Sequence, residues 1–138
     1  MKIEQTTDLS ICRALRHQVF VVEQNVPEAE EWDGLDGQAI HLVAWQGNKA
    51  VGTARILEKG DTGKIGRVCV TQEARGTGLG AALIRAALDV LRGRPGMRRA
   101  LLGAQTHAIG FYEKLGFVAH GPIYDDAGIP HRDMTRDL

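Results

Sequence analysis

Arg75–Gly80 is the segment of this chain whose residue types most clearly suggest a chemical role. It reads Arg-Gly-Thr-Gly-Leu-Gly, so that glycine alternates with other residues. Because glycine has no Cβ, several backbone N–H groups can converge on one point in such a turn. If a helix begins there, its unpaired N–H groups and the positive end of its dipole attract an anion. We call Arg75–Gly80 the glycine loop and expect it to bind a phosphate or pyrophosphate group.

A strand before the glycine loop and a helix after it are needed to hold the loop in place. β-branched residues recur in Ile65–Val70, which predicts a strand. After the loop, apolar residues recur at steps of three and four positions from Leu79 to Leu91, which predicts a helix. The glycine loop is therefore expected to join a strand to the N-terminus of a helix.

Two other phosphate-binding motifs do not match the glycine loop. The dinucleotide pattern G-x-G-x-x-G needs its third glycine one position after Gly80, and an acidic residue about 20 positions further on, where Arg98–Leu102 has none. A P-loop needs Gly-Lys followed by Ser or Thr, whereas Ala81 follows Gly80. The pattern that does match is R-x-x-G-x-G.

This pattern resembles the coenzyme A pyrophosphate loop of the GNAT (GCN5-related) N-acetyltransferases. A second segment, Phe111-Tyr112-Glu113-Lys114-Leu115-Gly116-Phe117, is similar to the F-Y-E-K-x-G-F stretch of the helix on the far side of the cofactor in that family. Together they make Ile40–Phe117 similar to a GNAT domain. The resemblance implies an α+β fold with a mostly antiparallel mixed sheet, splayed at the cofactor site and flanked by helices.

The resemblance also implies which residues contact acetyl-CoA. The pantetheine arm would hydrogen-bond the backbone of Val68–Val70. Gln105 stands where many members have an asparagine that contacts the cofactor, and His107 either faces the cofactor or is a polar residue at a helix start. The implied cofactor-binding residues are Val68, Cys69, Val70, Arg75, Gly76, Thr77, Gly78, Leu79, Gly80, Gln105, His107, Phe111 and Tyr112.

Tyr112 is the residue that the resemblance implicates most directly in the reaction. It stands where the family often places a general acid for the departing CoA thiolate, and a donor within hydrogen-bond reach favours that departure. The alternative is a half-buried aromatic residue whose hydroxyl bonds elsewhere. Phe111 and Phe117, on either side of it, are expected in the core.

The two ends of the chain are similar to the ElaA-like branch of the GNAT proteins. The similarity lies in Arg16–Pro27, followed by Asp36 and His41, and in Asp126–Met134. The C-terminal segment departs from the pattern E-D-G-I-P-H-x-x-M by Ala127, which is inserted before the glycine. The N-terminal pattern also resembles, more weakly, the acyl-homoserine-lactone synthases, whose chains are longer and bind acyl carrier protein.

Transfer to an amine requires a base, because an amine with a pKa near 10 is protonated at neutral pH. We expect direct attack of the amine on the thioester, with no covalent enzyme intermediate and with a backbone N–H of the splayed strand stabilising the oxyanion. The candidate bases are Glu23, His41 and His131. Each also has a structural interpretation, such as an ion pair of Glu23 with Arg16 or Arg55, or a strand-edge hydrogen bond of His41.

Acidic residues gather between the first predicted helix and the strand that follows. They are Glu23, Glu28, Glu30, Glu31, Asp33 and Asp36. This cluster is either a solvated surface or an acidic mouth that attracts a cationic amine. A calcium loop is not expected, because the ligand alternation of an EF-hand is absent.

The rest of the pattern predicts the elements around this centre. A helix is expected over Leu9–Val22, with its C-terminal turn buried nearly all round and with Arg13 and Arg16 off its apolar stripe. The other expected elements are strands at Lys2–Gln5, Ile40–Gln46, Val51–Glu58, Arg98–Ala104, Phe117–Ile123 and Ile129–Thr135, and short helices at Glu28–Trp32 and Ala108–Leu115. The strands that precede the glycine loop form an antiparallel meander. The helical crossover makes the strands on either side of it parallel.

Length and composition limit the remaining possibilities. The 138 residues predict a single domain over 1–138, and a formal net charge of zero provides no overall field for nucleic acid or an anionic membrane. Cys12 and Cys69 are too few and too far apart for a disulfide framework or a zinc site, and the histidine spacing predicts no metal. With no signal peptide and no apolar run of membrane-spanning length, a cytoplasmic protein is expected.

The sequence therefore predicts an enzyme that transfers the acetyl group of acetyl-CoA to a primary amine of a small molecule or peptide. No metal is expected, and homodimers are common for the implied fold. The alternative from another class is a non-catalytic acyl-CoA-binding module that senses or scaffolds, which the glycine loop suits equally well. Tyr112 and the acidic cluster favour the enzyme.

Overall fold

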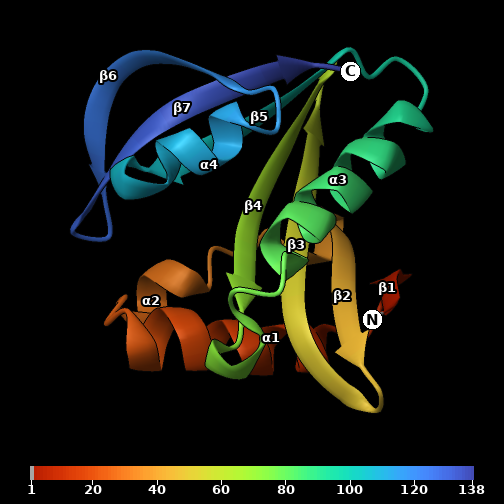
Figure 1. Cartoon of the computed structure of the whole chain (residues 1–138), viewed down its shortest axis with the longest axis vertical. Coiled ribbons are helices and arrows are strands. Elements are labelled where there is room, and N and C mark those ends of the chain that lie inside the picture. The colour runs from red at the N-terminus through yellow and green to blue at the C-terminus, as the bar shows by residue number, and fades with distance from the viewer. Residues whose placement is uncertain (1) are drawn as a thin grey trace.

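A seven-stranded sheet in the order β1-β2-β3-β4-β5-β7-β6 forms the centre of the fold (Figure 1). The computed structural model describes residues 2–138 apart from the side chain of Glu30. The strands are β1 (Lys2–Thr6), β2 (Ile40–Gln46), β3 (Lys49–Lys59), β4 (Thr62–Val70), β5 (Arg99–Gln105), β6 (Val118–Asp126) and β7 (Ile129–Asp137). The α-helices are α1 (Leu9–Arg16), α2 (Glu28–Glu31), α3 (Leu79–Arg92) and α4 (Ile109–Glu113). The other helical segments are the π-helical η1 (His17–Glu23) and the 3₁₀ turns η2 (Asp36–Gln38), η3 (Gln72–Ala74) and η4 (Thr106–Ala108).

The sheet confirms the predicted α+β class and the predicted strand directions. β2, β3 and β4 form the expected antiparallel meander. β4 and β5 are parallel, as the helical crossover between them predicts, but only Thr62–Lys64 and Arg99–Leu101 are paired. Beyond these residues the two strands diverge, and Figure 1 shows β4 and the β5–β7–β6 arm as two sides of a V. The splay that the family resemblance implies is therefore present.

A β-bulge lies in β4 at the start of the splay. Between the paired residues Arg55–Gly66 and Thr53–Cys69, β4 contains one residue more than β3. The backbone of Arg67 has a φ of 49°, in the left-handed region, which costs a non-glycine residue about 1 kcal/mol. Because a bulge bends its strand and increases the local twist, it helps to turn β4 away from β5 here.

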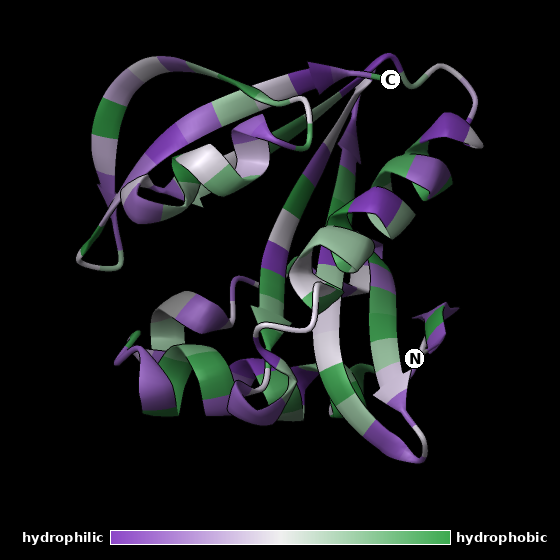
Figure 2. Cartoon of the chain, viewed as in Figure 1, coloured by the Kyte–Doolittle hydropathy of each residue, from purple (hydrophilic) through white to green (hydrophobic). Residues whose placement is uncertain are grey.

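α3 packs on one face of β2, β3 and β4 and supplies much of the main hydrophobic core. Its apolar residues recur at the predicted steps, and the buried ones are Leu79, Leu83, Ile84, Ala87, Leu88 and Leu91. Each leucine or isoleucine buried in this way contributes about 2 kcal/mol. Figure 2 shows hydrophobic residues recurring along α3 and along the central strands next to it. This core fixes the position of the α3 N-terminus, where the glycine loop ends.

α1 packs on the other face of the sheet, and its course differs from the prediction. Regular α-helix ends at Arg16, and the predicted remainder of the helix is the π-helical η1. Val22 is 65% exposed, so the expectation of a buried C-terminal turn is wrong. Arg16, expected outside the apolar stripe, is 1% exposed, because acidic partners accompany it into the interior.

The C-terminal arm of the V consists of β5, β7 and β6, with α4 packed against β5 and β6. β7 lies between β5 and β6 and runs antiparallel to both. This order places residues from the end of the chain opposite β4, across the splay. Among residues 2–138, no helix is long and apolar enough to cross a membrane.

Candidate active site

The glycine loop has the backbone geometry that anion binding requires. Gly76 and Gly78 have φ angles of +77° and +84°, which L side chains rarely adopt. Gly78 caps α3 without a side-chain hydrogen bond, so the first N–H groups of the helix have no partner within it. A Cβ at either glycine would have no heavy atom within 4 Å, which shows open space beside the loop. A phosphate group can therefore approach these N–H groups.

The other residues of the glycine loop hold it in place. Thr77 donates its hydroxyl to the Ala74 carbonyl, 2.5 Å away. Leu79 is 3% exposed and belongs to the core, so its side chain anchors the helix start. A Cβ on Gly80 would lie 3.6 Å from the Phe111 ring. The start of α3 thus packs beside α4.

Arg75 is paired with Glu23, one of the candidate bases. The guanidinium lies 2.6 and 2.9 Å from the two carboxylate oxygens of Glu23, and its Nε donates to the Val70 carbonyl at 3.1 Å. The hydrogen bond and the charge of Glu23 raise the pKa of Arg75. The expected partners of Glu23, Arg16 and Arg55, pair with other acids. Both carboxylate oxygens of Glu23 are thus occupied by Arg75, and the pair links η1 to the glycine loop.

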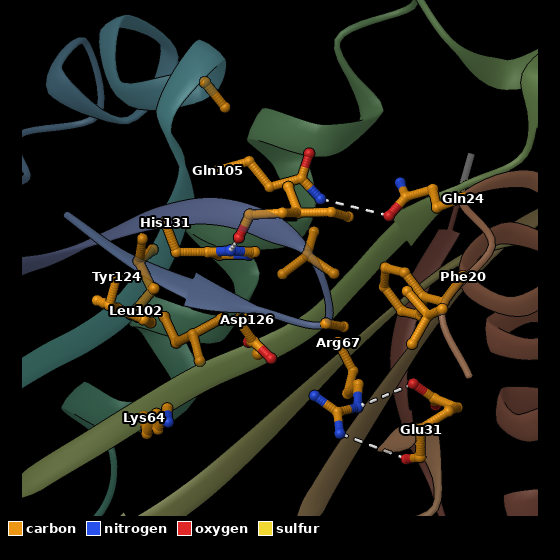
Figure 3. Close-up of a pocket in the computed structure, with 18 of the residues that line it drawn as sticks. Phe20, Gln24, Glu31, Lys64, Arg67, Leu102, Gln105, Tyr124, Asp126 and His131 are labelled. Carbon is orange, nitrogen blue, oxygen red and sulfur yellow. Dashed lines mark hydrogen bonds and ion pairs between the residues drawn. The ribbon is translucent and has the colours of Figure 1, made fainter. Parts of the chain in front are cut away.

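A cavity of about 310 Å³, which we call the V cavity, lies between the two sides of the V. One wall comes from η1, α2 and β4, and the other from β5, β6, β7 and α4. Figure 3 shows Phe20 and Arg67 on one side, with Leu102, Tyr124 and His131 on the other. Polar side chains on the walls include those of Gln24, Glu31, Lys64, Arg67, Gln105, Tyr112, Tyr124, Asp126 and His131.

A neighbouring space, the loop cavity, extends from the V cavity towards the glycine loop. Arg75 and His107 line the loop cavity, and Val68 and Gln105 line both cavities. The Gln105 amide nitrogen donates to Gln24 Oε1 at 3.3 Å, a bond that reaches across the V (Figure 3). His107 Nε2 donates to Oε1 of the Gln105 side chain at 2.7 Å, because an amide oxygen only accepts. Gln105 and His107 therefore meet at the junction of the two cavities.

The side chain of Cys69 is buried, although its backbone belongs to the splayed strand. It is 4% exposed and packs with Leu15 and Val19, with its Sγ 3.2 Å from the Thr53 hydroxyl. Burial raises the pKa of the Cys69 thiol to about 11. A thiol that stays neutral at physiological pH is not a nucleophile, so no acyl-cysteine intermediate is supported here.

Tyr112 lines the V cavity from α4. Its ring packs edge-on against Phe111 and Phe117, at 5.0 and 6.1 Å between centroids. Its hydroxyl makes no hydrogen bond with another described residue, and burial raises its pKa, so it stays protonated and free to donate. Phe117 is buried as expected, whereas Phe111 is 41% exposed, and its placement in the core is wrong. Phe111 instead lies against the start of α3, beside the glycine loop.

His131 and His41, the other two candidate bases, lie in different places. His131 lines the V cavity, and its Nδ1 donates to the Ile129 carbonyl at 2.7 Å. His41 is 4% exposed, its Nε2 lies 2.9 Å from the Asp36 carbonyl oxygen, and it lines neither cavity. His41 is therefore buried away from both cavities, in the kind of hydrogen bond that its structural interpretation describes.

The acidic cluster is not a mouth, because arginines occupy its central carboxylates. Arg16 pairs with Glu31 and, at 2.8 Å, with Asp36, and both carboxylates are nearly fully buried. Arg55 lies 2.7 Å from Asp33 and 3.2 Å from Asp36. Arg67, at the bulge, lies 3.1 Å from Glu31 and 3.3 Å from Asp33, and Arg13 reaches Asp36 at 3.2 Å. Glu28 is exposed and accepts from Trp32 Nε1, and the side chain of Glu30 lies outside the described part.

The pKa of Asp36 reflects this network. Burial alone raises it, but the hydrogen bond and charge of Arg16, with further bonds from Arg55 and Arg13, outweigh burial and lower it to about 2. The hydrogen bonds of Arg55 likewise hold the pKa of Asp33 well below its usual range. These carboxylates stay charged and paired with arginines at neutral pH, so they are not the free acidic surface that an acidic mouth would need.

Sequence reasoning missed several side chains on the walls of the V cavity. Lys64 and Arg67 come from β4, and Tyr124 and Asp126 from β6. The only available signal was proximity, since Lys64 and Arg67 belong to or adjoin the strand before the glycine loop and Tyr124 precedes the ElaA-like C-terminal segment.

Comparison with known proteins agrees with this geometry. The family model described as an acetyltransferase (GNAT) domain matches residues 4–138. The uncharacterized N-acetyltransferase YjcF of Bacillus subtilis is 40% identical over 124 residues, which are 89% of this chain and 88% of that protein.

Two solved structures are similar over nearly their whole length. The crystal structure of Escherichia coli ElaA superposes with a TM-score of 0.89 at 32% identity and covers 99% of each chain. An acyl-CoA N-acyltransferase from Pseudomonas aeruginosa superposes with a TM-score of 0.86 at 34% identity, covering 98% of this chain and 99% of that one.

Proposed function

The chain belongs to the GNAT acetyltransferase family and is an acyl-CoA-dependent N-acyltransferase, and on that premise we propose that it transfers the acetyl group of acetyl-CoA to a primary amine of a small molecule or peptide. The amine attacks the thioester directly while both substrates are bound. The observation that carries the proposal is the divergence of β4 and β5 beside the glycine loop, which opens the V cavity between them.

In this proposal the cofactor lies along the splayed edge of β4. The glycine loop binds the pyrophosphate through its backbone N–H groups. The pantetheine arm passes through the loop cavity and hydrogen-bonds the backbone of Val68–Val70, as an added strand would. Support comes from the pairing of β4 with β5, which stops at Lys64 and Leu101 and leaves that edge of β4 without a strand partner among the described residues.

His131 is the base that the geometry favours. Because a carbonyl oxygen only accepts, the bond to Ile129 requires the proton on Nδ1. In the neutral ring this leaves the lone pair on Nε2, which is then able to accept a proton from the amine. Glu23 is held by Arg75 and His41 lies outside both cavities, so neither competes for this role.

The reaction then needs no covalent enzyme intermediate. Nε2 of His131 first takes a proton from the ammonium group and passes it to solvent. The neutral amine nitrogen then forms a bond to the thioester carbon while its second proton passes to Nε2. A backbone N–H at the β4 bulge stabilises the oxyanion of the tetrahedral intermediate. The C–S bond breaks, and the CoA thiolate takes the hydroxyl proton of Tyr112, which solvent restores.

The test is thiol release from acetyl-CoA with a panel of amines, from polyamines and aminoglycosides to amino sugars and peptide N-termini, with cofactor binding measured by calorimetry. We expect turnover on one class of amine. Tyr112→Phe should bind acetyl-CoA normally and lose turnover on the order of a hundredfold. Normal turnover by that variant would remove Tyr112 from the acid role, and failure of the wild-type protein to bind acetyl-CoA would overturn the cofactor site.

A further inference from the structure

Tyr124 and Asp133 form a pair next to His131 that the mechanism above does not use. Tyr124 of β6 is directly opposite His131 of β7, and their rings are stacked at 6.0 Å with an angle of 23°. The Tyr124 hydroxyl donates to Asp133 Oδ1 at 2.7 Å. Asp133 lies two positions after His131, so both side chains project from the same face of β7. Tyr124 and His131 line the V cavity, and the hydrogen bond from the Tyr124 hydroxyl joins Asp133 to them.

Gly103 makes this arrangement possible. It lies opposite Asp133 in the pairing of β5 with β7. A Cβ at position 103 would lie 2.5 Å from the Tyr124 hydroxyl oxygen, closer than any such contact allows. The missing side chain on β5 therefore provides the space into which the Tyr124 hydroxyl reaches towards Asp133. Residues of β5, β6 and β7 thus together determine the position of the Tyr124 ring.

The hydrogen bond also distinguishes the roles of the two tyrosines, both of which line the V cavity. Burial and the Asp133 carboxylate raise the pKa of Tyr124, so its hydroxyl stays protonated, and that proton is committed to Asp133. Tyr112 has no such acceptor among the described residues. Tyr124 is therefore not a second acid, and any effect that it has on the reaction is exerted through His131.

We propose that Tyr124 and Asp133 are positioning residues for His131. The bond to Asp133 fixes the phenol ring, the stacked phenol ring fixes the plane of the imidazole, and the Ile129 carbonyl fixes which nitrogen carries the proton. Together they hold Nε2 towards the amine. The inference rests on the proposed function, in which His131 is the base. Proton transfer depends steeply on such alignment, so a loosened imidazole slows the chemical step without weakening cofactor binding.

The first test compares Tyr124→Phe, Asp133→Ala and Asp133→Asn, using acetyl-CoA and the amine that turns over fastest in the panel. Tyr124→Phe and Asp133→Ala should lower kcat about tenfold with an unchanged KM for acetyl-CoA. Asp133→Asn keeps an acceptor oxygen for the hydroxyl and should retain most of kcat. Val118→Ala, on the same strand as Tyr124 but 66% exposed and outside the V cavity, serves as the control with wild-type kinetics.

A double-mutant cycle decides whether Tyr124 acts through His131. His131→Ala should lower kcat on the order of a hundredfold and flatten the fall of rate at low pH. Adding Tyr124→Phe to His131→Ala should then have little further effect, because the two residues act as a unit. The inference would be overturned if Tyr124→Phe lowered kcat by the same factor in the wild-type and His131→Ala proteins, or if Tyr124→Phe alone had wild-type kcat. Wild-type kcat in His131→Ala would remove the base itself, and the positioning role with it.

A measurement that needs no acceptor covers the case in which no amine turns over. Nitrogen NMR of the neutral His131 ring, assigned by comparison with His131→Ala, should show the proton on Nδ1 in the wild-type protein. Tyr124→Phe should broaden or average these ring signals. A proton on Nε2 in the wild-type protein would contradict the arrangement, whatever the outcome of the amine panel.

Discussion

Replacement of Arg16 by methionine should be among the most destabilising single changes in this protein. The guanidinium is 1% exposed and pairs with Glu31 and Asp36, whose side chains are 2% and 6% exposed. Arg16→Met keeps much of the side-chain length but leaves two carboxylates buried without this partner. Arg13→Met is the matched control, because Arg13 lies one turn earlier on α1, also reaches Asp36 at 3.2 Å and also faces the Trp32 ring. The Arg13 side chain, however, is 49% exposed.

The two variants should differ by several kcal/mol in the free energy of unfolding. Removing one partner of a buried ion pair typically costs about 3–5 kcal/mol, since the remaining charge keeps its desolvation penalty. For a domain of this size that corresponds to a fall in Tm of roughly 15 °C. An exposed ion pair contributes about 1 kcal/mol or less, so Arg13→Met should lower Tm by only a few degrees.

The effect of Arg16→Met should also depend on pH, with a definite sign. The pKa of Asp36 is lowered from 3.8 to about 2, so the charged carboxylate stabilises the wild-type fold above about pH 4. That contribution is lost as the pH falls from about 4 through about 2. Without Arg16, burial is less well compensated and the pKa of Asp36 rises. The difference in stability between wild type and variant should therefore be largest near pH 7 and narrow below pH 4.

The assay is urea unfolding followed by the fluorescence of Trp32, which lies 5.5 Å from the Arg16 guanidinium, in a Trp45→Phe background. The midpoint and slope should be measured at pH 7 and at pH 3 for wild type, Arg16→Met and Arg13→Met. Two results would refute the reasoning from burial and charge. One is an equal free energy of unfolding for the two arginine variants at pH 7, and the other is a larger difference between wild type and Arg16→Met at pH 3 than at pH 7.

Two further predictions concern glycines. Gly78→Asp should abolish acetyl-CoA binding, because it places a side chain and a like charge where the phosphate must approach, and because φ is +84° there; calorimetry that finds unchanged affinity would remove the glycine loop as the cofactor site. Gly63→Ala should lower stability by about 1–3 kcal/mol, because a Cβ there would lie 2.2 Å from a methyl group of Leu91, which is 0% exposed and cannot move away. A wild-type denaturant midpoint for Gly63→Ala would show that α3 adjusts more easily than its packing suggests.

Elements with strong local patterns could be predicted from the sequence. Ile40–Gln46 is a strand with the predicted bounds, and the predicted helix from Leu79 to Leu91 is α3 with one residue more. The glycine loop was predicted from residue types alone, because a positive φ and close approach of N–H groups are properties of a few consecutive residues. Tyr112 belongs to a motif of similarly short range, whose family resemblance implies a place in the cofactor site, and Tyr112 lines the V cavity.

The interpretation of the charged side chains could not be reached in the same way. Arg16 lies off the apolar stripe of its predicted helix and so looks like a surface residue, and Glu31, Asp33 and Asp36 look like a solvated acidic loop. Arg16, Glu31 and Asp36 are nevertheless buried, because they pair with one another and with Arg55 and Arg67, which come from strands β3 and β4. A charged side chain taken alone is expected to be exposed. It can be buried only when the fold brings an oppositely charged side chain next to it.

The sequence by itself determined the glycine loop, the strand and helix that hold it, and the order of elements, because these depend on residues that are close in the chain. The tertiary structure alone decided where β4 and β5 part, which acids pair with which arginines, and which of three candidate bases faces the V cavity. The reason is physical: strand register brings Gly103, Tyr124 and His131 together from three strands, and the burial that sets partners and pKa values exists only after those strands have paired.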